Sequence, residues 1–387
     1  MRAVLKLIKD FFRKGDMVLL LLCLVASTYG CVIMASVTNA PKFGGSIRYI
    51  LIQILATLMG VVAYAIVSSI DVSFFSEHRF WLIVLNIFII LLLIPFGTDN
   101  GTGNRSWIDF PFLPIDIQAA EICKIGFILV LASVMASHQA RLSSPRSVIH
   151  MVFHLILLFG LNMAISRDAG VSLFFVAIFA GMTFAGGVSM LWYLLAGGLA
   201  AVVGPYYWTN IMTTRQRNRI LILFDPTIDP QGINERYHSR QSLLSLTGGG
   251  LTGQGLFNGN RTQSGSLFAQ HTDYIFSSVG EELGYIGCFF IMVLLFAIIA
   301  RCIWVGRKTP DYMRKLICFG TAASLIFQVV VNIGMCIGVM PVIGITLPLF
   351  SYGGSSILTT YAMLGLVSGI HARPSPASHE LYIRPPQ

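Results

Sequence analysis

The residues best suited to chemistry in this sequence are acidic side chains beside long apolar segments, and Asp273 is the first of them. It follows His271 and Thr272 at the end of a polar stretch, residues 208–274, that separates two blocks of apolar sequence. Burial at a membrane-bounded cavity raises the pKa of a carboxyl group toward the range of a general base. Asp273 is therefore the candidate catalytic base, and an N-terminal helix cap is the alternative interpretation.

Three further ionisable residues lie in or beside apolar segments, where charge is costly and therefore indicates function. Glu121 and Lys124 are three residues apart, so they share one face of a helix. A mutual salt bridge that locks two helices together is their alternative interpretation. Asp168 follows Arg167 at the start of an apolar run, where a helix cap explains it as well as catalysis does.

The polar stretch 208–274 also carries positive charge close to a glycine run, residues 248–250. Its arginines are Arg215, Arg217, Arg219, Arg236, Arg240 and Arg261. Guanidinium groups bind phosphate through paired hydrogen bonds, so contact with a phosphorylated ligand is one interpretation and a solvated loop is the other. The glycines match a dinucleotide fingerprint only formally, because the strand and helix that such a fold needs are missing around them.

Residue spacing gives no indication of zinc binding or of a disulfide framework. The seven cysteines lie in or at the ends of apolar segments, and no C-x-x-C pair occurs. His150 and His154 have the i,i+4 spacing of a helical metal pair, but no third ligand is near them in the sequence. An interfacial polar stripe is the better interpretation of the two histidines.

The elements that must position these residues are membrane helices. Hydrophobic residues make up 55% of the 387-residue chain, charged residues only 11%, and the mean hydropathy is +0.75. Because a span needs about 20 mostly apolar residues, the sequence predicts an all-α polytopic membrane protein that forms a single domain, residues 1–387. The ten predicted spans cover residues 17–36, 47–70, 80–96, 117–136, 148–165, 169–184, 188–207, 275–305, 316–340 and 355–370. Residues 208–274 then form a large extracytoplasmic loop between spans 7 and 8.

The distribution of positive charge predicts the orientation, since short cytoplasmic segments collect Lys and Arg. With the N-terminus inside, the cytoplasmic segments hold 15 of the 26 Lys and Arg residues, whereas the short outer loops hold four. Both termini are then cytoplasmic. This arrangement brings Trp107, the Glu121 end of its helix, Asp168, Asp273 and the loop before Ser355 to the outer face. Independent caps and bridges have no reason to share one side, so the convergence favours a site.

Three separated motifs carry a resemblance that covers nearly the whole chain. They are residues 332–338 with Pro341, Gly344, Leu347-Pro348 and Ser351-Tyr352-Gly353-Gly354-Ser355-Ser356; His271-Thr272-Asp273-Tyr274-Ile275-Phe276 followed by residues 280–284; and Arg219, Asp225-Pro226, Gln241-Ser242 and residues 248–255. In these motifs the chain resembles the SEDS family, bacterial cell-wall glycosyltransferases that include RodA, FtsW and SpoVE. The short C-terminal tail is more similar to the RodA type.

The chain departs from the usual family pattern around its acidic residues. Residues 118–121 read Q-A-A-E where Q-P-S-E is usual, and Ser106 replaces a common arginine before Trp107. Ser166-Arg167 stand where Q-P precedes Asp168 in the family. The acids themselves are retained, so activity is still predicted.

The resemblance implies an enzyme that polymerises lipid II into glycan strands at the outer face of the bacterial cytoplasmic membrane. Asp273 would deprotonate the acceptor 4-hydroxyl as it attacks the donor anomeric carbon, with inversion and loss of undecaprenyl pyrophosphate. The candidate substrate-binding residues are Trp107, Glu121, Lys124, Asp168, Arg215, Arg217, Arg219, His271, Ser351 and Ser355. A divalent cation, Mg²⁺ or Mn²⁺, held by Glu121 or Asp168 could assist the departure of pyrophosphate. The expected partners are membrane lipid, the nascent strand and a class B penicillin-binding protein, a transpeptidase; nucleic acid is not expected.

Two other functions stay open at this point. A flippase or transporter of lipid II would also place polar residues within its spans. The acids cluster at the outer face instead of the midplane, and no paired broken helices or inverted repeat are evident, so transport is disfavoured. A non-catalytic scaffold for a wall-synthesis partner is the third interpretation, and the retention of Asp273 argues against it.

Overall fold

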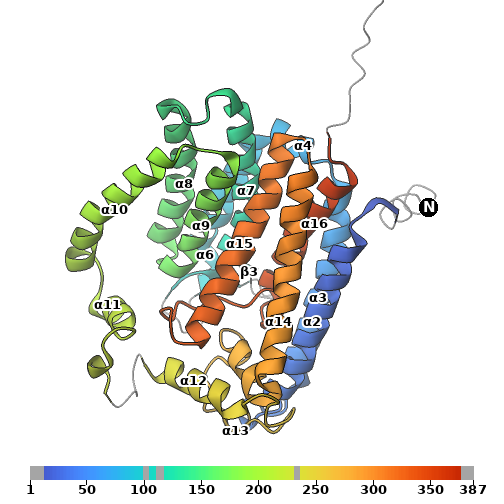
Figure 1. The fold of residues 1–387 in the computed structure, drawn as a ribbon, viewed down its shortest axis with the longest axis vertical. Helices are drawn as coiled ribbons and strands as arrows, with labels where there is room; N and C mark the ends of the chain where they lie inside the picture. The colour runs from blue at the N-terminus through green and yellow to red at the C-terminus, as the bar shows by residue number, and fades with distance from the viewer. Residues whose placement is uncertain (1–12, 99–103, 110–116, 231–235, 376–387) are drawn as a thin grey trace, which may run out of the picture.

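Long apolar runs form the predicted helices in the computed structural model, which describes residues 13–98, 104–109, 117–230 and 236–375 (Figure 1). The long helices are α2 (Met17–Val37), α3 (Ile47–Ser69), α5 (Arg79–Leu91), α7 (Ala119–Ser137), α8 (Pro145–Ile165), α9 (Ala169–Gly186), α10 (Met190–Asn210), α12 (Tyr237–Gly249), α14 (Ile275–Lys308), α15 (Tyr312–Cys336) and α16 (Gly354–Ala372). The short ones are α4 (Val72–Glu77), α6 (Leu93–Phe96), α11 (Thr214–Leu221), α13 (Asn260–Ser264), η1 (Pro41–Phe43), η2 (Gln139–Arg141) and η3 (Pro226–Ile228).

Nine segments of the described chain are helical, long and apolar enough to cross a membrane, which confirms a polytopic all-helical protein. The third of these segments combines α5 and α6, which meet at Leu92. The tenth predicted span, α16, is a helix of 19 residues that falls outside this set because serines and threonines lower its hydropathy. Almost all of α16 is buried against α3, α7 and α14, so its polar side chains are shielded from lipid.

Helix α14 is broken near its start, which the apolar pattern did not predict. Gly284 has φ 68° and ψ −167°, and a Cβ at this position would lie 2.4 Å from the carbonyl oxygen of Leu251. At 1.5 Å per residue the 34 residues of α14 would extend about 51 Å, well beyond a hydrocarbon core of about 30 Å. Gly284 therefore divides α14 into a short first segment and a long second one, a break that the apolar pattern does not indicate, while the span predicted from residue 275 matches the apolar helix Ile275–Lys308.

The described part of the polar stretch 208–274 contains three helices, α11, α12 and α13. Figure 1 shows α10 at the edge of the bundle, leading away to α11, while α12 and α13 cover one end of the bundle. Helix α12 packs against α14 and α15, and Gly249 at its end allows this, because a Cβ there would lie 1.9 Å from the Gly280 carbonyl oxygen. No residue of α10 is buried, so in a bilayer lipid would surround its apolar side chains.

Ion pairs join the helices at the end of the bundle opposite α12 and α13. Arg301 of α14 binds Asp16, the N-cap of α2, through two hydrogen bonds of 2.8 and 3.1 Å. Arg314 of α15 lies 2.7 Å from Asp71, the N-cap of α4. Removing one partner of such a bridge would leave a buried charge unpaired, so these contacts fix the relative positions of the helix ends.

Candidate active site

The turn that carries Asp273 is held by two segments that are distant in sequence. Asn332 of α15 donates through its amide nitrogen to the backbone oxygens of Asp273, at 2.8 Å, and Ile345, at 2.7 Å. The Ser351 hydroxyl donates to the backbone oxygen of Thr272 and accepts from the Leu347 backbone nitrogen at 2.8 Å. Because Ser351 is buried and its hydroxyl is used in both directions, its observed role is to position the turn.

Asp273 is half-buried and does not cap a helix. The N-cap of α14 is Tyr274, with no side-chain cap, so the alternative interpretation of Asp273 as a cap is not what the structure shows. Burial raises the pKa of Asp273 to about 6, a hydrogen bond from Thr272 opposes the shift, and the charge of Asp168 adds to it. A carboxyl group of this kind is still largely ionised at pH 7 and accepts a proton more readily than an exposed aspartate.

Asp168 is both the cap that the sequence allowed and an electrostatic neighbour of Asp273. One carboxyl oxygen accepts from the Val171 backbone nitrogen at 3.1 Å, which caps α9. The other accepts from the Ser106 hydroxyl at 3.0 Å. Burial raises the pKa of Asp168, and these hydrogen bonds oppose the rise. Ser106, where an arginine was expected, thus gives Asp168 a neutral partner.

Glu121 and Lys124 form the salt bridge that was their alternative interpretation. The Lys124 nitrogen lies 2.9 Å from a Glu121 oxygen, and both side chains are buried. Thr359 of α16 donates to the second Glu121 oxygen at 2.8 Å, and Lys124 lies 4.1 Å from the centroid of the Phe174 ring. The pair therefore joins α7 to α16 and α9, and Lys124 is not oriented toward an open surface.

Trp107 and Ser355 flank the start of α7. Trp107 belongs to a small antiparallel sheet with strand order β1 (Gly97–Thr98), β2 (Trp107–Ile108) and β3 (Ile117–Gln118). Its register partners are Thr98 and Gln118, and its side chain is half-buried. The Ser355 hydroxyl accepts from the Gln118 backbone nitrogen at 3.3 Å. The sheet thus connects Trp107 to the seam between α7 and α16.

The three predicted phosphate-binding arginines on α11 differ in their surroundings. Arg217 donates through Nε and Nη2 to the Met212 backbone oxygen, at 3.2 and 3.0 Å, so it fixes the connection after α10. Arg219 lies close enough to Tyr274, the neighbour of Asp273, for its charge to oppose the rise that burial causes in the pKa of that phenol. The side chain of Arg215 lies outside the described residues. Of these three arginines, Arg219 is the one whose charge acts on a residue of the Asp273 turn.

His271 is surrounded by aromatic side chains and is neutral at pH 7. Its ring centroid lies 5.0 Å from Phe43 and 5.7 Å from both Tyr49 and Tyr352. Burial, with the charge of Lys42 as a second cause, lowers the pKa of His271 to about 4. Sequence reasoning assigned no role to Phe43 of η1 or Tyr49 of α3, because nothing in their spacing connects them to residue 271.

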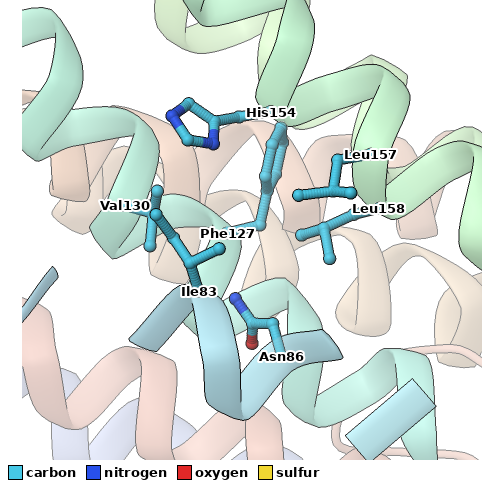
Figure 2. A pocket seen from close by; sticks show the side chains of 7 residues that line it. All are labelled: Ile83, Asn86, Phe127, Val130, His154, Leu157 and Leu158. Atoms are coloured by element: carbon cyan, nitrogen blue, oxygen red, sulfur yellow. The ribbon is translucent and has the colours of Figure 1, made fainter. Parts of the chain in front are cut away.

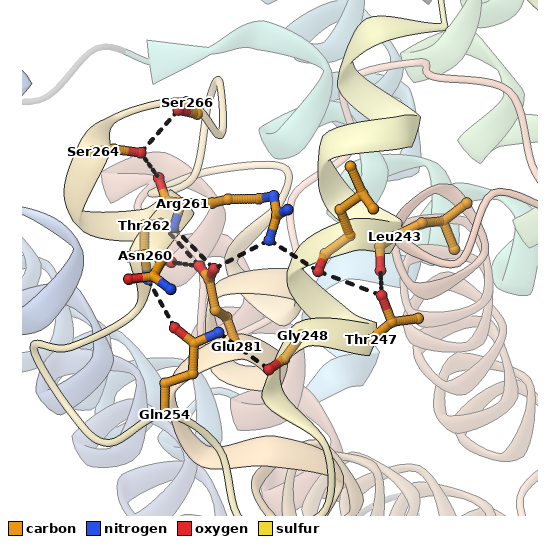
Figure 3. A network of polar contacts seen from close by, with 11 residues as sticks. Leu243, Thr247, Gly248, Gln254, Asn260, Arg261, Thr262, Ser264, Ser266 and Glu281 are labelled. Atoms are coloured by element: carbon orange, nitrogen blue, oxygen red, sulfur yellow. Dashed lines mark hydrogen bonds and ion pairs between the residues drawn. The ribbon is translucent and has the colours of Figure 1, made fainter.

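Glu281 organises the segment before the Asp273 turn and was not among the predicted site residues (Figure 3). It accepts hydrogen bonds from the backbone nitrogens of Arg261 and Thr262, at 2.9 and 2.8 Å, and from the Thr262 hydroxyl at 2.7 Å. The Arg261 guanidinium lies 3.8 Å from the same carboxylate. Glu282 in turn accepts from Ser36 of α2 and from Gln263, at 2.7 and 2.9 Å. Two adjacent buried glutamates in a polar-flanked segment were the sequence signal for this role.

The described acidic side chains of the candidate site do not group into a cation site. Among the residues that the structure describes, no three His, Cys, Asp or Glu side chains are grouped to hold a metal ion. Glu121 is engaged by Lys124 and Thr359, and both oxygens of Asp168 accept hydrogen bonds from the protein. The divalent cation stays a prediction.

The helical bundle and the acidic site define a polytopic membrane protein with ionisable groups at one end, and comparison with known proteins identifies its family. The family profile of FtsW, RodA and SpoVE, described as "Cell cycle protein", matches residues 16–375. The chain belongs to this family, and the resemblance carried by the three sequence motifs is confirmed.

Named relatives extend over most of the chain. The peptidoglycan glycosyltransferase MrdB of Escherichia coli (strain K12) is 31% identical over 313 residues, which cover 81% of this chain and 83% of MrdB. The probable peptidoglycan glycosyltransferase FtsW of Geobacter sp. (strain M18) is 29% identical over 368 residues, which cover 92% of this chain and 97% of that protein.

Solved structures share the fold. A chain reported under "Structural coordination of polymerization and crosslinking by a peptidoglycan synthase complex" superposes with a TM-score of 0.75 at 27% identity, covering 92% of this chain and 97% of that chain. The rod shape determining protein RodA of Thermus thermophilus superposes with a TM-score of 0.67 at 24% identity, covering 92% of this chain and 96% of that chain. The second likeness supports the fold alone.

Proposed function

We propose that this protein polymerises lipid II into glycan strands at the outer face of the bacterial cytoplasmic membrane. Its family and the names of its relatives support the reaction class. The observation that carries the proposal is Asp273, a half-buried carboxyl group whose pKa is raised to about 6, which does not cap a helix and whose backbone oxygen is held by Asn332. A general base needs this combination of proton affinity and fixed position.

In the proposed reaction Asp273 is the general base. The carboxylate takes the proton of the acceptor 4-hydroxyl while that oxygen bonds to the anomeric carbon of the donor sugar. The bond from the anomeric carbon to pyrophosphate breaks, and its electron pair leaves with undecaprenyl pyrophosphate, so the anomeric centre inverts. Asp168 contributes by raising the pKa of Asp273, and Arg219, next to Tyr274, is the cation best placed for the departing pyrophosphate.

The remaining site residues act by holding this geometry. Ser351 and Asn332 fix the turn, while Glu121, Lys124 and Ser355 fix the helices beside it. Trp107 and His271 offer half-buried rings near the same end of the bundle, where a sugar needs a partly wet, partly apolar surface. Both termini are then cytoplasmic, with Asp273 on the outer side.

The partner we propose is a class B penicillin-binding protein that cross-links the strands. The chain with a TM-score of 0.75 comes from a peptidoglycan synthase complex that couples polymerisation and crosslinking, which supports an assembly of this kind. Polymerisation should therefore be measured both with and without the cognate transpeptidase.

The test is polymerisation of labelled lipid II by the purified protein, wild type against Asp273→Asn. Loss of a general base typically costs about 10²- to 10⁴-fold in rate, so Asp273→Asn should abolish visible strands while the protein stays folded. Glu77→Gln is the matched control, because Glu77 is exposed at the far end of α4 and should polymerise at the wild-type rate. Strand formation by Asp273→Asn would sink the assignment of the base. Movement of lipid II between vesicle leaflets without strands would favour a flippase.

A further inference from the structure

A pocket opens at the end of the bundle opposite Asp273, between the end of α7 and the start of α8. Its volume is about 610 Å³, and it is lined by Ser137, His138, Ala140, Arg141, Ser144, Pro145, Arg146 and Ser147. The pocket walls come from one short connection, residues 137–147, that passes through η2. Since Asp168 and the Asp273 turn lie at the other ends of these helices, the pocket is separate from the proposed active site.

The connection that forms the pocket is rigidly held. The Trp192 indole nitrogen donates to the Ser143 backbone oxygen, and the Ser189 backbone nitrogen donates to the Ser143 hydroxyl, both at 2.9 Å. Ser144 caps α8, and its hydroxyl lies 2.9 Å from that of Ser147. Leu142 is buried beneath the connection. The pocket is therefore a preformed shape and does not depend on ordering by a ligand.

Positive charge in the pocket has no ion-pair partner among the described residues. Arg141 and Arg146 are exposed, and no carboxylate of the described residues forms an ion pair with either of them or with the neighbouring Arg79. Most other buried or half-buried acids are already engaged, as Asp16 is by Arg301 and Asp71 by Arg314. Two guanidinium groups without a counter-charge beside one cavity suit an anion.

His138 of the pocket is the first of three histidines whose rings lie side by side. His138 lines the pocket, its ring centroid lies 5.2 Å from that of His150, and His150 lies 5.1 Å from His154. The Nδ1 atom of His138 lies 2.9 Å from the Val134 backbone oxygen, so this nitrogen carries the proton and the ring is fixed. His154 reaches a cavity of about 10 Å³ beside Asn86 (Figure 2). That space holds about one water at most, so it is too small for a phosphate group.

We propose that the pocket of residues 137–147 binds a phosphate group through Arg141 and Arg146. Guanidinium forks match phosphate oxygens in geometry, and the two arginines lie in the connection between the apolar helices α7 and α8, where a bilayer would present its headgroups. An anionic phospholipid and a soluble phosphate carry the same chemistry to this site. Binding at this pocket does not depend on the function proposed for Asp273.

The first experiment measures lipid retention. The protein is reconstituted in vesicles of equimolar phosphatidylglycerol and phosphatidylcholine, extracted mildly and analysed by native mass spectrometry. Wild type should retain phosphatidylglycerol, and Arg141→Gln/Arg146→Gln should retain about tenfold less, because two charge-assisted contacts are lost. Arg307→Gln/Lys308→Gln, which removes the same charge at the same end of the bundle from the end of α14, should retain as much as wild type.

A second arm distinguishes the two sources of phosphate. Titration of inorganic phosphate into wild type held in phosphatidylcholine nanodiscs, followed by calorimetry, detects a soluble ligand. Heat that disappears in Arg141→Gln/Arg146→Gln assigns the pocket to soluble phosphate, and retention of phosphatidylglycerol without such heat assigns it to a lipid headgroup. Equal behaviour of this variant and wild type in both arms overturns the proposal.

A conservative variant protects the test against misfolding. Arg141→Lys/Arg146→Lys keeps the charge but loses the forked geometry, so it should fold and retain phosphatidylglycerol less well than wild type. If the glutamine variant does not fold, this lysine variant decides: reduced retention supports the pocket, and unchanged retention overturns it.

Discussion

The amide nitrogen of Asn332 lies 2.8 Å from the backbone oxygen of Asp273 and 2.7 Å from that of Ile345. One side chain from α15 thereby joins the turn that carries the proposed base to the segment that leads to Ser351. Because the contact is made to the backbone of Asp273, its carboxyl group stays available to substrate. The position of the base is thus set by a residue 59 positions away in the sequence.

Replacing Asn332 should misplace the base without removing it. In Asn332→Ala the backbone oxygen of Asp273 loses its donor and the turn relaxes, so we expect polymerisation to fall by about tenfold or more. The acid limb of the pH–rate profile should also move to lower pH, because a less buried carboxyl group has a lower pKa.

Asn162 provides the matched control for this variant. It is buried like Asn332 but bridges α8 and α9 by donating to the Ser172 hydroxyl at 2.8 Å. Asn162→Ala should lower thermal stability and leave the acid limb in place. The same pH shift in both variants would contradict a specific positioning role for Asn332.

The pH dependence of polymerisation should report the titration of Asp273. Burial raises the pKa of this group to about 6, and a general base works only when it is deprotonated. The rate should therefore increase with pH through about 6 and level off above it, in contrast to an exposed aspartate, which would level off near pH 4. Rates of lipid II polymerisation measured across this range check the prediction, and a flat profile between pH 5 and 7 would count against Asp273 as the base.

Variants of the buried pair Glu121 and Lys124 can distinguish a structural role of the pair from a role in the reaction. Lys124→Met leaves the Glu121 carboxylate buried beside Thr359 without its cation, which should destabilise the fold by about 3–5 kcal/mol. Adding Glu121→Gln removes the unpaired charge and should recover most of that stability. Thermal unfolding in detergent measures the difference.

Polymerisation by the double variant then tells the two roles of the pair apart. Recovery of both stability and rate would assign Glu121 and Lys124 to helix packing alone. Recovery of stability without rate would support contact with substrate. A single Lys124→Met variant as stable as wild type would contradict the bridge as the structure shows it.

Much of this architecture follows from local sequence, and the exceptions depend on contacts between distant residues. Apolar runs identify the helices because burial and lipid both select them along the chain. The bridge between Glu121 and Lys124 was foreseen as an alternative, because i,i+3 spacing alone brings the pair together. The break at Gly284 was missed because hydropathy does not encode a positive φ, and here Leu251 leaves no room for a Cβ.

In the candidate site, too, local sequence pointed to some residues, whereas contacts between distant residues could not be predicted. Asp273 was identified from its type and its place beside an apolar run, whereas its support by Asn332 joins elements far apart in the sequence. Ser351 belonged to the strongest motif, yet its contact with Thr272 shows a positioning role that a motif cannot specify. Phe43 of η1 and Tyr49 of α3 lie beside His271, and the sequence around them carries no sign of that neighbour.

Replacing Glu281 should loosen the segment that precedes the proposed base. One of the Glu281 carboxylate oxygens serves the Arg261 backbone nitrogen and the other serves both donors of Thr262. In Glu281→Gln an amide nitrogen replaces one of these oxygens and cannot accept, so at least one buried donor loses its partner. Amide hydrogen exchange should rise several-fold across residues 250–265 and remain unchanged in α15, and polymerisation should fall because the turn at Asp273 follows directly. Glu77→Gln, which changes an exposed glutamate, should alter neither measurement. Unchanged exchange in Glu281→Gln would show that the segment is held by its packing on α14 and not by this carboxylate.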